Sequence, residues 1–574
     1  MTTPQILEAE SSAESAAGEG RFGDRLASHP LAAGTLSGLL LWTAFPPLEW
    51  NWLAWVALVP LFWLAVQPAR RWLYYASAWL GGLAFWLPSV QWIRLTDPTA
   101  WLAWLAMATF LSLWWPTVLG LCRLAVFRLR IPLLIAAPIV WVALEYFRAH
   151  VLTGFPWYYL GHSQYRFLTL IQIADTTSAL GISFLVVMVN ACVVDLMTLP
   201  LLYATPRGPR LRPRQSIRVW ITLGLVVATL GYGTLRIATA RFRPGPRMAL
   251  LQTNFEQRYK MGGDGLSILE AIERLIEKAA AATPRPDLIV WPETAYPYRF
   301  IMLDPGVAAD ELKRQVAQIS KTEPVEDWLE NRRRTLAYLH GLTDSTGIAM
   351  LVGATYTDHT PTKMSKYNSA ILLEPNSQEV RAYHKIHLVP FGEYIPFFES
   401  MPWLKALTPY GDDYVPTLTF GRDATILPFG AYRLAVGICF EDTVPHVIRR
   451  FFAEASGPEP DVLVNISNDG WFHGSAELDM HLAVSVFRAI EHRVPLVRAV
   501  NTGISALVDG NGEIRQTLPR DTDGVLNAEV PLDDRTSNFT ILGDWLGLSC
   551  LAVSIGLVPM GFLMKFRSAR RNVA

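Results

Sequence analysis

The sequence predicts a two-part protein, in which a polytopic α-helical membrane domain of about eight spans carries an α/β domain outside the cytoplasm. Two observations lead to this fold class. Forty of the 50 acidic residues lie after position 240, and no lysine occurs before Lys260. After about residue 245, short β-branched runs alternate with helix-like stretches, a pattern typical of layered α/β domains. A charge-poor first half therefore joins a second half of ordinary soluble composition.

The first half contains apolar segments of the length that a bilayer requires, about 20 residues per helix. Residues 1–28 are polar and are expected to form a cytoplasmic tail, and residues 29–240 a membrane domain of about seven spans. One more membrane helix is expected at 541–565, with a cytoplasmic tail at 566–574. The seven candidate spans before it lie near 31–48, 50–66, 72–93, 100–126, 131–147, 170–202 and 217–239.

Arginine placement predicts the orientation of these spans. Pairs of arginines follow the second and fourth candidate spans, and five arginines between 207 and 218 follow the sixth. Positively charged loops tend to stay in the cytoplasm. Both termini are therefore expected inside, and the α/β domain at 245–535 is expected outside.

Composition excludes several classes of function. The formal net charge is +0 and the sequence pI is about 7.2, which gives no support to nucleic-acid binding. Four cysteines in 574 residues are too few for a disulfide framework. Seven spans are more than a simple membrane anchor requires. They favour a domain that also forms a lipid-binding site open to the bilayer, or a translocation path. A transporter with a degenerate outer domain remains an alternative.

Reactive side chains follow two apolar runs of the α/β region. The run DLIVWPE ends at Glu293, and RLAVGICFE carries Cys439 and Glu441. Between them, YHKIHLVPFGEY carries Lys385 and Glu393. In α/β sheets, ligands bind outside the carboxyl ends of the strands. We therefore expect a thiol, a carboxylate and an ammonium group to face one crevice.

These three groups suffice for acyl transfer without a metal or a cofactor. A cysteine attacks as thiolate, and a nearby cation favours that form. A carboxylate can take up the thiol proton, and a lysine ammonium can stabilise the oxyanion of a tetrahedral intermediate. A zinc site is the weaker alternative, because the pairs His384 with His387 and His473 with His481 lie in no regular ligand pattern.

The order of the motifs resembles the nitrilase superfamily. WPE at 291–293, K-x₇-E at 385–393 and G-x-C-F-E at 437–441 have its order and spacing, and the resemblance covers about residues 245–535. A domain of this kind between seven spans and one terminal span resembles the apolipoprotein N-acyltransferase family. The resemblance implies a four-layered αββα sandwich with Glu293 as general base, Lys385 stabilising the intermediate and Cys439 as nucleophile.

The family resemblance also implies an activity and its partners. A fatty acyl chain would pass from a phospholipid, phosphatidylethanolamine above all, through a thioester to the N-terminal amine of a diacylglyceryl-modified apolipoprotein. Glu393 and Glu441 would support the triad. The expected location is the bacterial inner membrane with the catalytic domain facing the periplasm, and the expected state is a monomer. Two positions depart from the family pattern, namely Phe440, where Tyr is common, and Met261, where Trp is common.

Two further expectations concern substrate access and the acceptor. The aromatic, proline-broken stretch at 396–410 follows Glu393 directly and is expected to form a lid that dips into the membrane interface, with Trp403 and Leu404 deepest. Packing of this loop against its own domain is the alternative. The alternative activity is that of a membrane-tethered amidase or nitrilase, with water in place of the amine.

Overall fold

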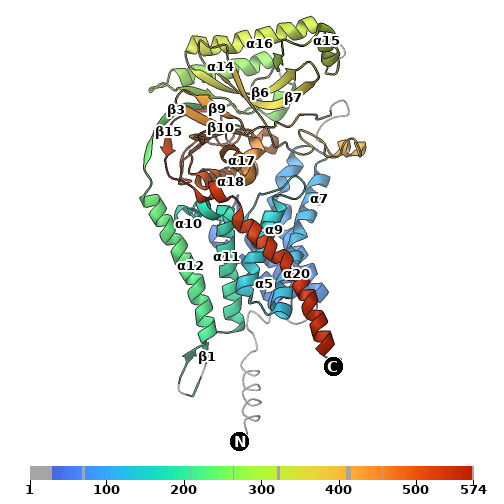
Figure 1. Cartoon of the computed structure of the whole chain (residues 1–574), viewed down its shortest axis with the longest axis vertical. Helices are drawn as coiled ribbons and strands as arrows, with labels where there is room; N and C mark the ends of the chain where they lie inside the picture. The colour runs from blue at the N-terminus through green and yellow to red at the C-terminus, as the bar shows by residue number, and fades with distance from the viewer. Residues whose placement is uncertain are drawn as a thin grey trace.

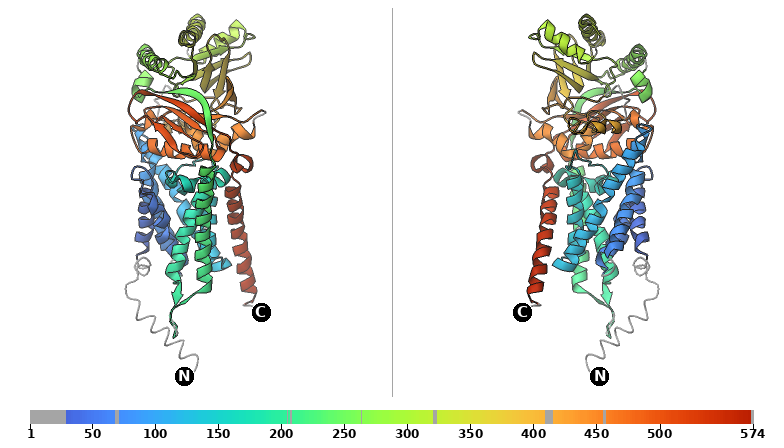
Figure 2. Two further views of the ribbon diagram at one scale, coloured as in Figure 1. Left: turned by 90° about the vertical axis from the view of Figure 1, so that its left-hand side faces the viewer. Right: turned by 90° about the vertical axis from the view of Figure 1, so that its right-hand side faces the viewer.

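A bundle of apolar helices and a layered α/β domain stand end to end along the long axis of the molecule (Figure 1). The computed structural model describes residues 29–67, 71–203, 205–206, 208–262, 264–319, 323–408, 415–454 and 457–571. The predicted N-terminal tail at 1–28 lies outside these residues. Figure 2 shows the same two tiers from both sides, with the terminal helix α20 (Trp545–Arg571) along one flank of the bundle.

The bundle is built from helices of unequal length. Among the described residues, four helical stretches are long and apolar enough to cross a membrane, namely Trp101–Leu129, Ala174–Thr198, Pro213–Ala238 and Trp545–Lys565. Each lies at one of the eight predicted spans, and shorter helices occupy the other four. The helices are α3 (Pro30–Thr43), α4 (Ala54–Ala57), α5 (Val59–Val66), α6 (Arg71–Ser89), α7 (Trp101–Ser112), α8 (Trp114–Arg123), α9 (Leu133–Arg148), α10 (Leu168–Ile171), α11 (Ala174–Thr198) and α12 (Pro213–Ala238), with η1 (Asn51–Leu53), η2 (Gln91–Leu95), η3 (Leu124–Leu129) and η4 (Leu160–Gln164) between them.

Helices α3 and α6 approach each other closely because glycines line their contact. A Cβ atom on Gly34 would lie 2.0 Å from the carbonyl oxygen of Ser77, and one on Gly38 would lie 2.0 Å from that of Gly81. Small residues let helix backbones touch in this way inside a membrane. The first candidate span is thus packed tightly against the third.

The α/β domain contains two sheets. The seven-stranded sheet has the order β15-β3-β4-β6-β7-β8, with β5 paired to β6, and the six-stranded sheet has the order β14-β13-β12-β11-β10-β9. Strands β10, β11 and β12 run parallel. The strands are β3 (Phe242–Gln252), β4 (Leu288–Val290), β5 (Phe300–Leu303), β6 (Ala349–His359), β7 (Met364–Leu373), β8 (Val380–His384), β9 (Ile426–Phe429), β10 (Tyr432–Ile438), β11 (Val462–Asn468), β12 (Leu496–Asn501), β13 (Ala506–Val508), β14 (Ile514–Thr517) and β15 (Gly524–Asp533), and a separate small sheet joins β1 (Leu202–Tyr203) to β2 (Arg210–Leu211).

Helices cover both outer faces of the paired sheets. One apolar cluster joins α14 (Gly265–Ala280) and α16 (Val325–Thr346) to one face of the seven-stranded sheet. The other face of that sheet shares a second cluster with the six-stranded sheet, α17 (Pro445–Ala453) and α18 (Glu477–His492). The result is four layers in the order helix, sheet, sheet, helix, with α14 and α16 farthest from the bundle (Figure 1). The remaining short helices of the domain are α13 (Gln257–Gly262), α15 (Ala309–Ala317), η5 (Pro402–Leu407), η6 (Cys439–Thr443), η7 (Asp469–Phe472) and α19 (Asn538–Leu542).

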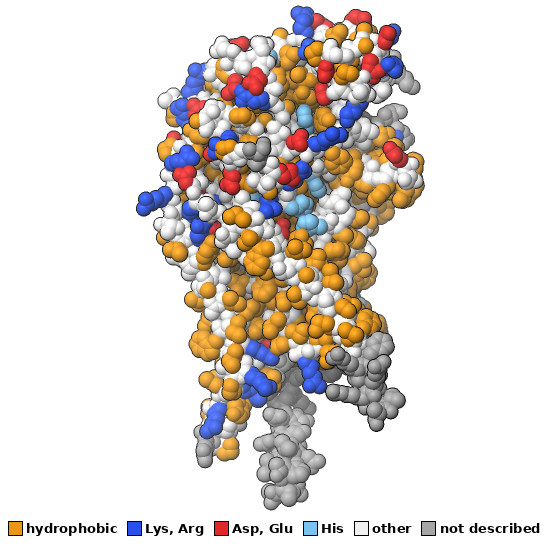
Figure 3. Space-filling model, in the orientation of Figure 1, with side chains coloured by type: hydrophobic (Ala, Val, Ile, Leu, Met, Phe, Trp, Pro, Cys, Tyr) orange, Lys and Arg blue, Asp and Glu red, His pale blue; other side chains and the backbone are white. Residues whose placement is uncertain are grey.

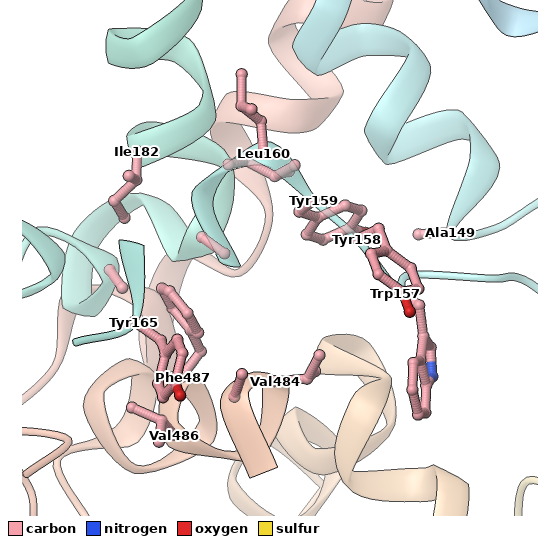
Figure 4. Packing of buried hydrophobic residues seen from close by; sticks show 14 of the residues in the cluster. Ala149, Trp157, Tyr158, Tyr159, Leu160, Tyr165, Ile182, Val484, Val486 and Phe487 are labelled. Carbon is pink, nitrogen blue, oxygen red and sulfur yellow. The ribbon is translucent and has the colours of Figure 1, made fainter. Parts of the chain in front are cut away.

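The inner helix layer rests on the membrane bundle. Figure 4 shows Phe487 of α18 beside Tyr165, which belongs to the segment after α9, and the Phe487 ring also lies 5.1 Å from that of His162 in the same segment. Below this contact, orange apolar side chains cover the visible surface, whereas charged side chains crowd the α/β domain above it (Figure 3). Phe487, His162 and Tyr165 are all buried in this contact.

The acid-rich segment 302–330 has no strand pattern in its sequence, but β5 extends to Leu303 and pairs in parallel with β6. Ile301 of β5 packs with Trp328 of α16 in a small apolar cluster of its own. At the other end of the chain, α20 continues to Arg571, past the predicted end of the last span at 565.

Acidic residues inside the bundle are paired. The Asp175 carboxylate accepts hydrogen bonds from Arg493 Nη2 at 2.6 Å and Nε at 3.0 Å, and Asp195 lies 2.9 Å from Arg218. Glu145 accepts from Trp141 Nε1 at 2.9 Å. Because Arg493 follows α18, the Asp175 pair ties the bundle to the α/β domain.

Candidate active site

The nucleophile candidate begins the short helix η6, directly after β10. Cys439 has a φ of +53°, a left-handed conformation that costs a non-glycine residue roughly 1–2 kcal/mol. Such strain gathers at functional sites. Cys439 is partly accessible, whereas the other three cysteines are buried. The turn thus lifts this thiol out of the sheet, at the carboxyl end of β10.

Lys385 directly follows β8. Its ammonium is 2.9 Å from Glu393 Oε2 and 3.5 Å from Glu293 Oε1, and its side chain is only 1% exposed. Burial lowers the pKa of Lys385, but the charges of Glu393 and Glu293 outweigh burial and raise the pKa above its usual value. Lys385 therefore remains an ammonium at neutral pH.

Asn368 holds the two carboxylates together. This residue of β7 donates from Nδ2 to Glu293 Oε1 at 2.6 Å and to Glu393 Oε1 at 2.9 Å. The backbone N–H of Val389 donates to the other oxygen of Glu393 at 2.8 Å. Sequence reasoning missed Asn368, because only the strand register places it opposite two carboxylates that are distant in sequence.

Glu441 clamps the loop of the nucleophile to the loop of the lysine. Its buried carboxylate accepts from the N–H groups of Ile438 and Ile386, each at 2.7 Å, and of His387 at 2.9 Å. The hydroxyl of Tyr383 donates to it at 2.9 Å. Burial raises the pKa of Glu441 to about 7, although Lys385 and these donors oppose the shift.

The thiol is protonated in this environment. Burial raises the pKa of Cys439 well above its usual value, Glu293 raises it further, and Lys385 only partly offsets both. A base beside the sulfur is then required for attack, and Glu293 is the carboxylate that contributes most to this shift. The arrangement can therefore perform nucleophilic acyl transfer with a carboxylate base and an ammonium next to the developing charge.

Comparison with known proteins gives the relationship. Residues 37–192 match the model of the apolipoprotein N-acyltransferase N-terminal domain, and residues 249–537 match that of carbon-nitrogen hydrolases. Apolipoprotein N-acyltransferase of Geobacter metallireducens is 34% identical over 92% of this chain and 95% of its own. The chain belongs to the apolipoprotein N-acyltransferase family. The enzyme of the same name from Rhodopirellula baltica is 28% identical over 94% of this chain and 99% of its own. A solved carbon-nitrogen hydrolase superfamily protein from Xanthomonas campestris is 16% identical, with a TM-score of 0.33 over 50% of this chain and 91% of that one.

In this family member, the membrane domain supplies one wall of the site. The Phe440 ring stacks on Trp157, with centroids 6.5 Å apart, and on His387 at 5.7 Å. Trp157 is buried, and Arg148 at the end of α9 donates to its carbonyl oxygen at 2.7 Å. The segment between α9 and α10 thus reaches Phe440, the residue next to Cys439.

The segment predicted as a lid begins and ends beside Glu393. Tyr394 pairs with Thr417, and the N–H of Leu418 donates to the Glu393 carbonyl oxygen at 3.0 Å. Between them, Phe397 and Trp403 are each 67% exposed. Leu404 lies in the short helix η5 and is partly buried. Residues 409 and 410, the end of the predicted lid, lie outside the described residues.

A buried charge cluster lies behind the nucleophile turn. Asp469, Glu477 and His481 present ligand atoms within 4.8 Å of one another, a spacing that a metal ion needs. His481 also lies 2.8 Å from Asp442, and the guanidinium of Arg498 lies 2.9 Å from Asp442 and 3.7 Å from Asp469. Burial and Arg498 lower the pKa of His481, but Asp442 and Asp469 outweigh them and raise it to about 10. Two cations of the protein therefore already balance these carboxylates, which makes the cluster a poor metal site.

Proposed function

We propose that this membrane-bound N-acyltransferase moves a fatty acyl chain from a phospholipid to Cys439, and then to the N-terminal amine of a diacylglyceryl-modified apolipoprotein. The observation that carries the proposal is the joint position of the reactive groups. Glu293, Lys385 and Glu393 meet within hydrogen-bond distance beside the thiol turn, while a residue of the membrane domain stacks on Phe440. These contacts support a site at which the membrane-bound half and the reactive groups act on one lipid substrate.

The first half-reaction forms the thioester. Glu293 takes the proton from Sγ of Cys439, and the sulfur attacks the carbonyl carbon of the phospholipid ester. The Lys385 ammonium donates to the resulting oxyanion. When the intermediate collapses, the carbon–oxygen bond breaks, and protonated Glu293 returns its proton to the leaving alkoxide of the lysophospholipid.

In the second half-reaction, the nucleophile is a nitrogen and the leaving group is the sulfur of Cys439. The neutral α-amine attacks the thioester carbonyl, and Glu293 takes a proton from the nitrogen. The carbon–sulfur bond breaks, the amide is released, and the proton passes to the thiolate. Glu393 keeps Lys385 in place through both steps, and Glu441 keeps the two loops together.

We place the catalytic domain on the periplasmic side of a bacterial inner membrane. Basic side chains gather at the end of the bundle opposite the catalytic domain (Figure 3), as expected for a cytoplasmic end. We also propose phosphatidylethanolamine as the donor and a monomer as the working state. A reporter that is active only outside the cytoplasm should be active when fused after Arg535 and silent after Arg214. The reverse pattern would contradict the topology.

The acceptor is tested with purified protein in phospholipid vesicles. An acyl adduct on Cys439 should accumulate with phospholipid alone and should disappear when a diacylglyceryl lipopeptide with a free amine is added. Mass spectrometry follows both species. Release of free fatty acid at the same rate with and without lipopeptide would favour the amidase or nitrilase alternative.

We further propose that the segment 396–408 is a lid for lipid entry. Its base is fixed on both sides of Glu393, while its aromatic residues Phe397 and Trp403 point away from the protein interior. A segment with this composition partitions into a membrane interface.

A further inference from the structure

Lys260 lies next to the triad although none of the three family motifs contains it. It belongs to α13, the short helix after β3. Its ammonium donates to the carbonyl oxygen of Glu293 at 2.9 Å and to the hydroxyl of Thr294 at 3.0 Å. Lys260 thus hydrogen-bonds both the backbone of Glu293, the proposed base, and the side chain of Thr294, the residue that follows it.

The turn that Lys260 grips is strained. Thr294 has a φ of +46°, and a β-branched residue in this region is a genuine outlier. Such a turn persists only where the surroundings fix it. Close packing leaves it little freedom, because a Cβ on Gly353 would lie 2.1 Å from the carbonyl oxygen of Pro292. The two hydrogen bonds from Lys260 fix the other side of the turn, and with it the direction of the Glu293 carboxylate.

The charged groups around the thiol include the carboxylates of Glu293, Asp469 and Glu393 and the ammonium of Lys385. When Glu293 takes up the thiol proton, the negative charge passes from its carboxylate to the sulfur, where a nearby cation favours the thiolate. Burial lowers the pKa of Lys260 to about 8, while Glu293 and Cys439 oppose that shift. Lys260 therefore still carries a positive charge at neutral pH.

We propose that Lys260 is a positioning residue of the acylation site, which fixes the Glu293–Thr294 turn and supplies the second positive charge beside the thiolate. It acts through Glu293 and Cys439 and does not contact the acyl group. The inference extends the proposed function, since it explains how a thiol whose own surroundings favour protonation is activated. Its test does not require that function, because alkylation of the thiol needs no acyl donor.

The test measures iodoacetamide alkylation of Cys439 against pH in the full-length protein in detergent. Lys260→Met and Lys260→Gln remove the charge, Lys260→Arg keeps it, and Thr294→Val removes only the hydroxyl partner. Lys278→Met is the matched control on the exposed side of α14. Cys439→Ser gives the background from the buried cysteines.

We expect both neutral variants to move the alkylation midpoint upward by about one pH unit and to slow alkylation near pH 7.5 about tenfold. Lys260→Arg should recover at least a third of the wild-type rate, Thr294→Val should lose no more than about threefold, and Lys278→Met should match wild type. A wild-type pH profile in Lys260→Met or Lys260→Gln would overturn the proposal, and so would a loss in Thr294→Val as large as in the neutral variants. If the proposed acyl transfer were wrong, all variants would lack a thioester while the alkylation differences remained.

Discussion

Replacing Lys385 by Met tests whether the triad is held together by one buried charge. The ammonium lies 2.9 Å from Glu393 and 3.5 Å from Glu293 and is 1% exposed. Methionine keeps the length of the side chain but leaves two carboxylates without their cation. Breaking a buried ion pair from one side costs about 3–5 kcal/mol. For a domain of this size, each kcal/mol lowers the melting temperature by about 2–4 °C, so a fall of about 10 °C is expected.

A double-mutant cycle separates this effect from simple loss of packing. Thermal unfolding of the detergent-solubilised protein, followed by tryptophan fluorescence, would compare wild type, Lys385→Met, Glu393→Gln and the double variant. Removing one carboxylate relieves the repulsion, so the double variant should be more stable than Lys385→Met alone, with a coupling of about 2 kcal/mol. Strictly additive effects, or an unchanged melting temperature in Lys385→Met, would refute the reasoning.

Two further predictions concern the thiol and its clamp. Cys439→Ser should abolish both the acyl adduct and acyl transfer, because a hydroxyl is far harder to ionise than a thiol. Mass spectrometry of the protein from membranes checks for the adduct. Full transfer activity in Cys439→Ala would exclude the covalent route. Burial raises the pKa of Glu441 to about 7. The Glu441 carboxyl group therefore holds its proton more tightly in the folded protein than in the unfolded chain. The stability that this proton contributes is lost as pH rises from about 4.5 to 7. That loss amounts to about 3 kcal/mol. Glu441→Gln cannot titrate, and its unfolding free energy should decline less over this range; equal slopes in both proteins would contradict the assignment.

The reactive residues were predictable because each lies in a contiguous motif at a strand end. Glu293 lies three residues after the end of β4, and Cys439 directly follows β10, so the apolar runs that predict the strands also locate the groups. The pairing of Lys385 with the two carboxylates could be predicted only from the family resemblance, because the segment after β8 forms no regular helix or strand. Local sequence thus indicates which residues lie at strand ends, but not how they meet.

The supporting contacts were not predictable, because they depend on register and on packing between distant segments. Asn368 reaches Glu293 only through the antiparallel pairing of β6 with β7, in which it lies opposite Thr355. Trp157 reaches Phe440 across 283 positions of sequence. Strand β5 escaped prediction because four residues are too few for a periodic signal, and it forms through pairing with β6. Lys260 gave no signal at all, as a lone lysine on a short polar helix is usually solvated.

The lid makes the sharpest prediction about substrate access, because the ester of a phospholipid lies in the membrane interface. Phe397 and Trp403 are each 67% exposed, and Met401 is 39% exposed, so the segment offers apolar surface that water solvates poorly. Burying a large apolar side chain contributes about 1.5–3 kcal/mol. Trp403→Ser with Leu404→Ser should therefore slow thioester formation from vesicle phospholipid by about tenfold or more. A short-chain, water-soluble ester needs no membrane contact and should react at the wild-type rate.

A matched control keeps this prediction specific to the membrane. Leu266→Ser with Leu329→Ser removes two exposed leucines from α14 and α16, the layer farthest from the bundle, and should leave both donors unaffected. If the loop instead packs against its own domain, loss of Trp403 and Leu404 removes contacts that every donor needs. Both donors would then slow together, and the melting temperature would fall. That result would refute the lid, because an interfacial segment contributes to catalysis only when the acyl group must leave a bilayer.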